Sequence, residues 1–181
     1  MKYNVIMIIG PAGSGKDTLA KRLCAMHPNI FNFVVSATTR PIRENEKQNI
    51  DYIFMSEEEF HSTDMLETSN FNNWWYGTPL SSFDPLLTNV VVANPQGVES
   101  YLKDKEHIEV QKIYFLNTKD KIRLLRQLNR EEEPNVEEIV RRYGTDKKDF
   151  EVLNFKYISL PNNNQEDFKK NFHEILMDNL D

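Results

Sequence analysis

Apolar and polar positions alternate in blocks along the chain, and these blocks predict strands and helices in turn. Residues 5–9 form a short run without a polar side chain, which indicates a strand buried on both faces. A glycine-rich stretch follows, and apolar residues then recur at helical spacing from about Lys16 to Met26. This order of strand, loop and helix is typical of an α/β fold.

The second half of the chain repeats this alternation. Further strands are predicted at 88–94, 109–116 and 156–160, and helices at 96–103, 119–130, 136–150 and 165–180. The last helix is amphipathic, whereas the two before it are heavily charged. We therefore expect a parallel sheet flanked by helices.

The region between these two halves has a different composition. The apolar run FNFVVSA at 31–37 predicts a strand, and DYIFM at 51–55 and NWWYG at 73–77 look like short strands in polar surroundings. Ser56 and Glu59 have the spacing of a capping box, which opens a short helix. The expected division is a core of residues 1–35, 80–122 and 151–181, a first excursion at 36–79 and a second at 123–150.

Length, charge and cysteine content narrow the classes of function. A chain of 181 residues suits one compact unit, and a net charge of −6 argues against nucleic acid or a membrane surface as the main partner. The apolar start is much shorter than the roughly 20 residues of a membrane span, so we expect a cytoplasmic protein.

Cys24, the only cysteine, lies at helical spacing from Leu19 and Leu23 and is expected to be a packed core thiol. The scattered histidines have no zinc-site spacing.

The glycine-rich stretch GPAGSGKDT has the features of a phosphate-binding loop. Its glycines let backbone N–H groups turn toward phosphate oxygens, the next helix points its positive end at them, and Lys16 reaches the terminal phosphates. The sequence therefore predicts a nucleoside triphosphate site. Its residues are Gly10, Pro11, Ala12, Gly13, Ser14, Gly15, Lys16, Asp17 and Thr18. Position 17 departs from the pattern, because aspartate stands where serine or threonine is expected.

A second basic cluster follows the strand predicted at 31–37. Arg40 and Arg43 lie three residues apart, and Tyr52 is close by in sequence. Arginine binds phosphate through paired hydrogen bonds, so this cluster is a candidate second phosphate site. Solvated surface arginines are the alternative.

Several motifs together resemble the guanylate kinase family. GPAGSGKDTL, SATTRPIR, DYIFMSEEEF, MLETSNF and WWYGT occur in the order and approximate spacing of that family. The resemblance spans nearly the whole chain and is strongest in its first half. It implies a P-loop fold with a monophosphate-binding insertion and a helical lid, ATP and Mg²⁺ as cofactors, and GMP or dGMP as the substrate.

The resemblance also assigns residues. It implies a monophosphate site of Arg40, Arg43, Tyr52 and Tyr76 and a base site of Ser36, Glu67, Thr78 and Asn94. The chemistry agrees, because guanine presents two neighbouring N–H donors and the Glu67 carboxylate offers two acceptors.

Two departures from the family concern acidic residues. Guanylate kinases usually carry aspartates where this chain has Val92 and Asn94, whereas Asp17 is an additional carboxylate. Our hypothesis is that Asp17 serves Mg²⁺ directly or through water, which makes it the candidate metal residue. The alternative is that Asp17 only favours the positive end of the helix.

The charged segment from Arg123 to Thr145 resembles the mobile lid of the family. Its arginines, with Lys16, are candidates to neutralise the transferring phosphoryl group, namely Arg126, Arg130, Arg141 and Arg142. One residue is inserted relative to the family, so the choice between Arg141 and Arg142 stays open. A helix with charge pairs at i, i+4 explains the same pattern.

Two other functions are compatible with parts of the sequence. GKDT, TRP, YGTP and Asn94 also resemble ribose 1,5-bisphosphate phosphokinase, although a sugar phosphate would not demand Ser36, Arg43 and Glu67. A non-catalytic guanylate kinase-like binding module is the second alternative, and the intact Lys16 loop argues against it. The preference between GMP and dGMP and the oligomeric state stay open.

Overall fold

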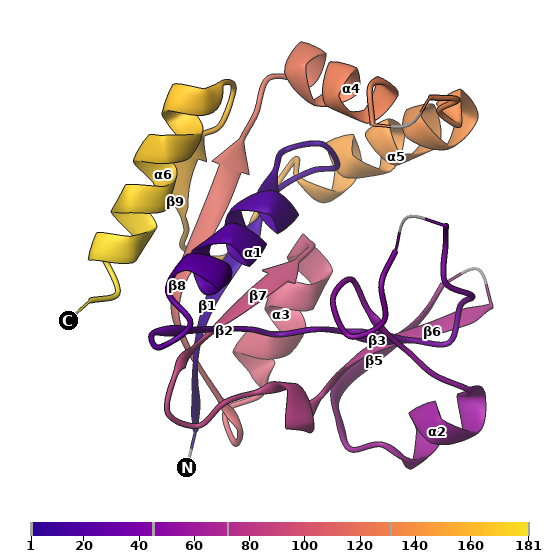
Figure 1. Ribbon diagram of the computed structural model, residues 1–181, viewed down its shortest axis with the longest axis vertical. Coiled ribbons are helices and arrows are strands. Elements are labelled where there is room, and N and C mark those ends of the chain that lie inside the picture. The colour runs from indigo at the N-terminus through magenta and orange to yellow at the C-terminus, as the bar shows by residue number, and fades with distance from the viewer. Residues whose placement is uncertain (1, 45, 72, 131, 181) are drawn as a thin grey trace.

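The central element is a five-stranded parallel sheet (Figure 1). The structure is a computed structural model that describes residues 2–44, 46–71, 73–130 and 132–180. The strand order is β2-β7-β1-β8-β9, and their bounds are β1 Tyr3–Ile9, β2 Phe31–Phe33, β7 Thr88–Ala93, β8 Ile108–Asn117 and β9 Ile158–Pro161. The parallel sheet predicted from the alternation of strands and helices is confirmed.

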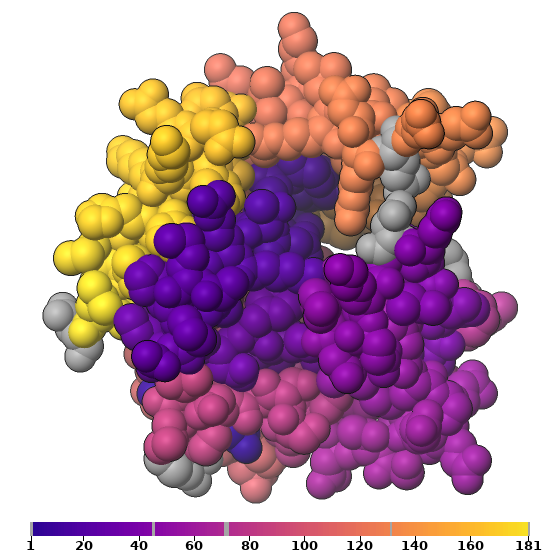
Figure 2. All heavy atoms as spheres, viewed as in Figure 1, coloured from indigo at the N-terminus to yellow at the C-terminus, as the bar shows by residue number. Residues whose placement is uncertain are grey.

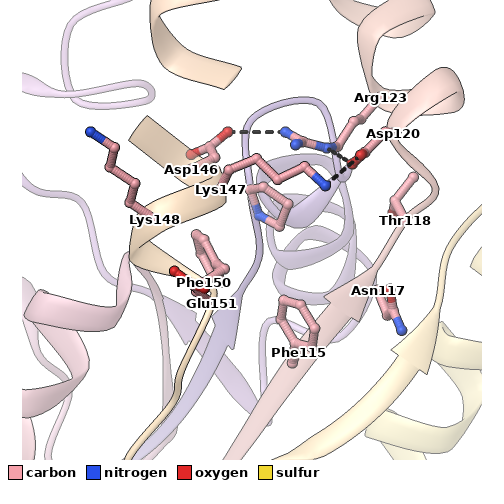
Figure 3. Close-up of a pocket in the computed structure, with 11 residues that line it drawn as sticks. Phe115, Asn117, Thr118, Asp120, Arg123, Asp146, Lys147, Lys148, Phe150 and Glu151 are labelled. Atoms are coloured by element: carbon pink, nitrogen blue, oxygen red, sulfur yellow. Dashed lines mark hydrogen bonds and ion pairs between the residues drawn. The ribbon is translucent and has the colours of Figure 1, made fainter. Parts of the chain in front are cut away.

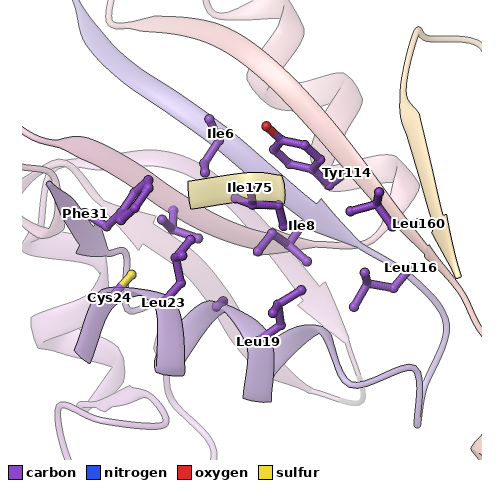
Figure 4. Close-up of a cluster of buried hydrophobic side chains, with 12 residues drawn as sticks. Ile6, Ile8, Leu19, Leu23, Cys24, Phe31, Tyr114, Leu116, Leu160 and Ile175 are labelled. Carbon is purple, nitrogen blue, oxygen red and sulfur yellow. The ribbon is translucent and has the colours of Figure 1, made fainter. Parts of the chain in front are cut away.

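Helices cover both faces of this sheet. The alternation along β1 divides its side chains, so that Ile6 and Ile8 face one core cluster while Val5, Met7 and Ile9 face the other. The first cluster includes residues of α1 (Lys16–Met26) and α6 (Gln165–Met177), and Figure 4 shows their side chains packed on the sheet. The second cluster includes residues of α3 (Pro95–Lys103).

The single cysteine belongs to the first of these clusters. Cys24 is buried there, and burial raises the pKa of its thiol to about 12. A thiol with such a pKa stays protonated at neutral pH and is a poor nucleophile. The prediction of a packed core thiol is confirmed.

A smaller mixed sheet is formed by the middle of the chain. Its strand order is β4-β3-β6-β5, with β3 Ala37–Thr38, β4 Ile53–Phe54, β5 Met65–Phe71 and β6 Trp74–Pro79. Helix α2 (Glu57–Ser62) precedes β5, and a short 3₁₀ helix spans Leu80–Ser82. The Ser56 and Glu59 capping box is confirmed, because the Ser56 N–H donates to Glu59 at 2.8 Å and the Glu59 N–H donates to Ser56 at 3.2 Å.

Strand β5 had no clear signal in the sequence. Its middle is polar from Glu67 to Asn70, so neither an apolar run nor a strict alternation marks it as a strand. It forms because it pairs antiparallel with β6. That pairing places Glu67 and Thr78 on neighbouring strands.

Two helices lie at the carboxyl end of the central sheet (Figure 1). Helix α4 spans Asp120–Leu128 and α5 spans Val136–Asp149, so both predicted helices are present. Helix α4 begins one residue later than predicted because Lys119 is its N-cap. The Asn135 side chain caps α5 by accepting the Glu138 N–H at 3.0 Å. No helix in the described ranges is long and apolar enough to cross a membrane.

Candidate active site

The loop between β1 and α1 has a backbone that only glycine adopts easily. Gly13 and Gly15 have φ angles of 78° and 93°, in the left-handed region. A Cβ on Gly13 would collide with the backbone carbonyl of Arg123, and one on Gly15 would lie 2.7 Å from Asn162 Nδ2. The loop therefore has both the shape and the tight surroundings of a phosphate cradle.

Three side chains fix the loop through one carbonyl. The Ser14 carbonyl accepts from Asn162 Nδ2 at 2.6 Å, from Thr118 Oγ1 at 3.2 Å and from Arg126 Nη1 at 3.2 Å. Asn162 and Thr118 were not assigned from the sequence, because they follow β9 and β8 and meet the loop only in the folded chain. A peptide held by three donors has little freedom to turn.

The hydroxyl of Ser14 is a buried polar group within the loop. This side chain is fully buried, and its Oγ has no hydrogen-bond partner in the described part of the chain. Buried polar groups without partners are rare and need an explanation. A phosphate oxygen is an acceptor of suitable chemistry, so the loop fits the phosphates of a nucleotide such as ATP.

Lys16 and Asp17 form an ion pair at the start of α1. Lys16 Nζ lies 3.3 Å from Asp17 Oδ2, and the Asp17 side chain is 64% exposed. Desolvation raises the pKa of Asp17, but the charges of Lys16 and Lys21 outweigh it and hold the pKa below its usual value. Asp17 is thus an ionised carboxylate next to the cradle.

Asp17 suits Mg²⁺ only as one ligand among several. No group of three or more histidine, cysteine, aspartate or glutamate side chains with metal-site geometry occurs among the described residues. Mg²⁺ commonly takes one or two carboxylates and completes its shell with substrate phosphates and water. The exposed Asp17 beside the phosphate loop fits that arrangement.

The predicted second phosphate site is brought together on the smaller sheet. The Arg40 guanidinium is 8% exposed and lies 5.1 Å from the centre of the Tyr52 ring, which lies 6.1 Å from that of Tyr76. Burial raises the pKa of the Tyr52 hydroxyl, and the charge of Asp17 raises it further, so the loop carboxylate acts on this site too. Arg43 is exposed at its edge.

Glu46 holds Arg40 in place, and the sequence did not identify it. Its carboxylate accepts from Arg40 Nη1 at 2.7 Å and Nη2 at 2.6 Å, and it also accepts the Arg43 N–H at 3.0 Å. Arg40 Nη1 donates in addition to the Pro41 carbonyl. These three bonds leave two of the five guanidinium N–H groups, on Nε and Nη2, without a partner in the described ranges. These two groups share one edge, which suits a phosphate bound through two oxygens.

Glu67 and Thr78, both predicted for the base site, are joined by a hydrogen bond. Thr78 Oγ1 donates to Glu67 Oε1 at 2.8 Å, and Thr78 is almost fully buried. Burial raises the pKa of Glu67, and the Thr78 hydrogen bond opposes this rise. Ser36 is half-buried just before β3.

Asn94 has a structural task. Its Oδ1 accepts the Gly97 N–H at 2.8 Å and caps α3. It also lines a cavity of about 450 Å³ together with Arg141, Arg142 and residues of α5. Asn94 therefore faces the lid, and its role at the base stays a prediction.

Two of the four arginines predicted for the lid are held by one glutamate. Arg141 donates to Glu138 at 2.7 and 2.9 Å, and Arg142 donates to it at 2.7 Å, so the charge pairs of the alternative interpretation are present. Both arginines nevertheless line the cavity beside Asn94. The hydrogen bond from Lys21 is the main cause that lowers the pKa of Asp51. The charge of exposed Arg130 lowers this pKa slightly further. Figure 2 shows a recess between the orange α4 and α5 and the violet residues of the smaller sheet.

Comparison with known proteins decides the family. The family model for guanylate kinase matches residues 2–179. The chain belongs to the guanylate kinase family. Membership makes it a nucleoside monophosphate kinase, which is a phosphotransferase.

Individual guanylate kinases support this membership. The guanylate kinase of Clostridium perfringens SM101 is 30% identical over 96% of this chain and 82% of its own length, and that of Prochlorococcus marinus is 31% identical over 94% and 90%. The Helicobacter hepaticus guanylate kinase is 36% identical, but the alignment covers 66% of this chain and 62% of that protein. A guanylate kinase structure from Anaplasma phagocytophilum shares the fold, with a TM-score of 0.65 and 18% identity over 100% of this chain and 89% of its own.

In this guanylate kinase family member, ion pairs around buried Arg123 join helices α4 and α5, and Asp146 of this cluster also contacts the phosphate loop (Figure 3). Arg123 is 2% exposed and donates to Asp120 at 3.0 Å and to Asp146 at 3.1 Å. Asp146 also accepts the Ala12 N–H of the loop at 2.8 Å. Hydrogen bonds from Lys147 and Tyr143 hold the pKa of Asp120 well below its usual value. The sequence offered no signal for this cluster, because charged residues at helical spacing usually lie on solvated faces.

Asp146→Asn tests how much this cluster contributes to stability. The substitution leaves an amide oxygen for Ala12 but removes one of two carboxylates from buried Arg123, so we expect the free energy of unfolding to fall by about 1 to 3 kcal/mol. Urea unfolding measures the change. Asp149→Asn, three residues along α5, is the control and should change stability by less than about 0.5 kcal/mol. Equal stability of the two variants would contradict the role of Asp146.

Proposed function

We propose that this protein transfers the γ-phosphoryl group of ATP to GMP or dGMP and releases the two diphosphates. The observation that carries the proposal is the Glu67–Thr78 pair on the same sheet as the Arg40 phosphate anchor. One small sheet thus offers a phosphate-binding edge and a base-reading carboxylate. A nucleoside monophosphate matches both.

The donor nucleotide belongs at the phosphate loop. The loop amides and Lys16 hold its phosphates, and the donors on the Ser14 carbonyl keep the loop in shape. Asp17 is the residue that would hold Mg²⁺, which supplies charge neutralisation on the phosphate oxygens when it is bound.

The acceptor belongs on the smaller sheet. The free edge of Arg40, with Arg43, Tyr52 and Tyr76, binds its phosphate. Glu67 accepts the two N–H groups of guanine, whereas adenine presents an unprotonated ring nitrogen to it. Ser36, Thr78 and Asn94 are the further base-site residues of the proposal.

The chemistry needs positioning more than a general base. An oxygen of the acceptor phosphate is already anionic, so it attacks the γ-phosphorus directly, and the bond to the oxygen between the β and γ phosphates breaks in line with it. Charge on the transferring group is neutralised by Lys16 and by lid arginines, for which Arg130, Arg141 and Arg142 are the candidates. Closure of the recess excludes water and so prevents ATP hydrolysis.

An acceptor panel tests this function. We expect ADP release with GMP and dGMP and little with AMP, CMP, dTMP or ribose 1,5-bisphosphate. Glu67→Ala should lower kcat/KM for GMP by about 100-fold, because two hydrogen bonds to a charged group are lost. Glu58→Ala, an exposed glutamate on α2, is the control. Activity on the sugar bisphosphate that ignores Glu67 would favour the sugar kinase, and ATP binding without any transfer would favour a binding module.

The raised pKa of Glu67 predicts a dependence on pH. Only the ionised carboxylate accepts both guanine N–H groups, so GMP should bind more weakly as pH falls through a pKa that burial has raised. The substrate phosphate also titrates, but it does so equally with Glu67→Gln. The ratio of kcat/KM between the original protein and Glu67→Gln should therefore fall as the pH is lowered toward 5. A ratio that is constant with pH would contradict the assignment.

The proposed role of Asp17 predicts a change in magnesium dependence. We expect Asp17→Ala to raise the Mg²⁺ concentration needed for half-maximal activity by about tenfold, and Asp17→Ser, which restores the usual oxygen ligand, to recover much of this loss. Asp64→Ala removes an equal charge from the surface after α2 and should change nothing. A Mg²⁺ dependence that is unchanged from the original protein in both position 17 variants would contradict this role.

A further inference from the structure

Two separate parts of the chain carry the two phosphate sites of the proposed reaction. The phosphate loop and α1 belong to the core with the central sheet, whereas Arg40 and Tyr52 belong to the region of the smaller sheet. In-line transfer needs the attacking oxygen about 3 to 3.5 Å from the γ-phosphorus, and a misplacement of about 1 Å can cost about 100-fold in rate. The position of one part relative to the other therefore matters for the rate.

An ion pair joins these two parts. Lys21 Nζ of α1 donates to Asp51 Oδ1 at 2.6 Å, and the two side chains are 33% and 30% exposed. No other ion pair joins residues 1–35 to residues 36–79 within the described ranges. Figure 2 shows the indigo residues of α1 beside the purple residues of the smaller sheet. The Lys21–Asp51 pair is thus a charged contact between the donor side and the acceptor side.

Each partner of this pair lies next to a residue predicted for one of the sites. Lys21 follows Asp17 by four residues in α1, so the two side chains lie on the same face of the helix, one turn apart. Asp51 directly precedes Tyr52, and the Arg40 guanidinium carbon lies 5.1 Å from the centre of the Tyr52 ring. The pair therefore links the first turns of α1 to the phosphate anchor of the acceptor.

The loop that carries Asp51 is held in shape by its own hydrogen bonds. The second oxygen of Asp51 accepts the Lys47 N–H at 2.8 Å, and the Asp51 N–H donates to the Lys47 carbonyl at 3.1 Å. The Gln48 side chain accepts the Phe54 N–H at 2.8 Å and donates to the Phe54 carbonyl at 3.0 Å. A loop fixed in this way passes the position of its ion pair on to Tyr52.

We propose that Lys21 and Asp51 are positioning residues of the phosphoryl transfer, whose ion pair sets the distance between the acceptor phosphate site and the phosphate loop. The proposal rests on the proposed function, since it concerns the geometry between the two sites of that function. Neither residue needs to touch a nucleotide. The hydrogen bond from Lys21 lowers the pKa of Asp51, so the carboxylate keeps its charge at neutral pH.

Lys21→Met and Asp51→Asn each remove the ion pair with little change of shape. We expect kcat for GMP to fall about 10- to 100-fold, because the acceptor oxygen is no longer held in line. The Kd of GMP and that of ATP, each titrated alone, should change less than about twofold, because both phosphate sites stay intact. A partly exposed ion pair adds little stability, so the melting temperature should stay within a few degrees.

Two further variants are controls. Lys21→Arg keeps a charge that pairs with a carboxylate and should keep kcat within about threefold of the original protein. Arg22→Met removes a charge from the neighbouring position of α1. The Arg22 guanidinium carbon lies 5.8 Å from the centre of the Phe168 ring of α6, so this variant leaves the contact with the smaller sheet unchanged and should not change kcat.

A linked ligand tests the spacing without the chemistry. Adenosine and guanosine joined by five phosphates occupy both sites at once, so the affinity of this compound depends on the distance between the sites. We expect Lys21→Met and Asp51→Asn each to weaken its binding by about tenfold. The double variant should lose no more than either single variant, because the two residues act as one pair.

Three outcomes would overturn the proposal: a kcat for GMP that is unchanged in the single variants, losses that multiply in the double variant, or a loss confined to the Kd of GMP. The proposed function is tested separately by the original protein. If the original protein does not phosphorylate GMP, the proposed function is refuted and the proposal falls with it. If the original protein is active and the variants match it, the proposal alone fails.

Discussion

The conformation of the phosphate loop is the constraint on which the rest of the site depends. Its left-handed glycines have neighbouring atoms so close that a Cβ would not fit. The Ser14 carbonyl accepts hydrogen bonds from Thr118 and Asn162, which follow two other strands. These donors meet at the loop because β1 lies beside β8, and β8 beside β9, with all three strands parallel. The carboxyl ends of parallel strands share one edge of the sheet, so the loop meets these donors only in the assembled sheet.

Polar contacts connect the phosphate loop and helix α1 to the predicted lid and to the smaller sheet region. Asp146 bridges the loop backbone and buried Arg123, and Lys21 of α1 pairs with Asp51 of the smaller sheet region at 2.6 Å. Such contacts depend strongly on geometry and are exchanged more readily than a packed core. They suit the closure that we propose above for these elements.

The proposed acceptor site uses carboxylates in two opposite ways. Both carboxylate oxygens of Glu46 accept hydrogen bonds from Arg40 and so fix the direction of its guanidinium group. The other edge of the guanidinium group, with Nε and Nη2, is then oriented for phosphate. Glu67 has a hydroxyl donor on one oxygen and stays available on the other. In both cases a partner within the protein sets the orientation before any substrate arrives, which lowers the entropic cost of binding.

The sequence by itself determined most of the central strands, the helices and the phosphate loop, because burial on two faces, helical spacing and glycine content are local signals. The single strand predicted at 31–37 was wrong in extent, because the structure divides this run between β2 of the central sheet and β3 of the smaller sheet. It also singled out Arg40, Tyr52, Glu67 and Thr78, through motifs whose spacing the small sheet preserves. Strand β5 was missed, because a polar strand exists only through its pairing with β6. The roles of Glu46, Arg123 and Asp146 became visible only in the tertiary structure. Each of them looks like an ordinary surface charge in the sequence, and its role comes from a partner that folding brings within reach.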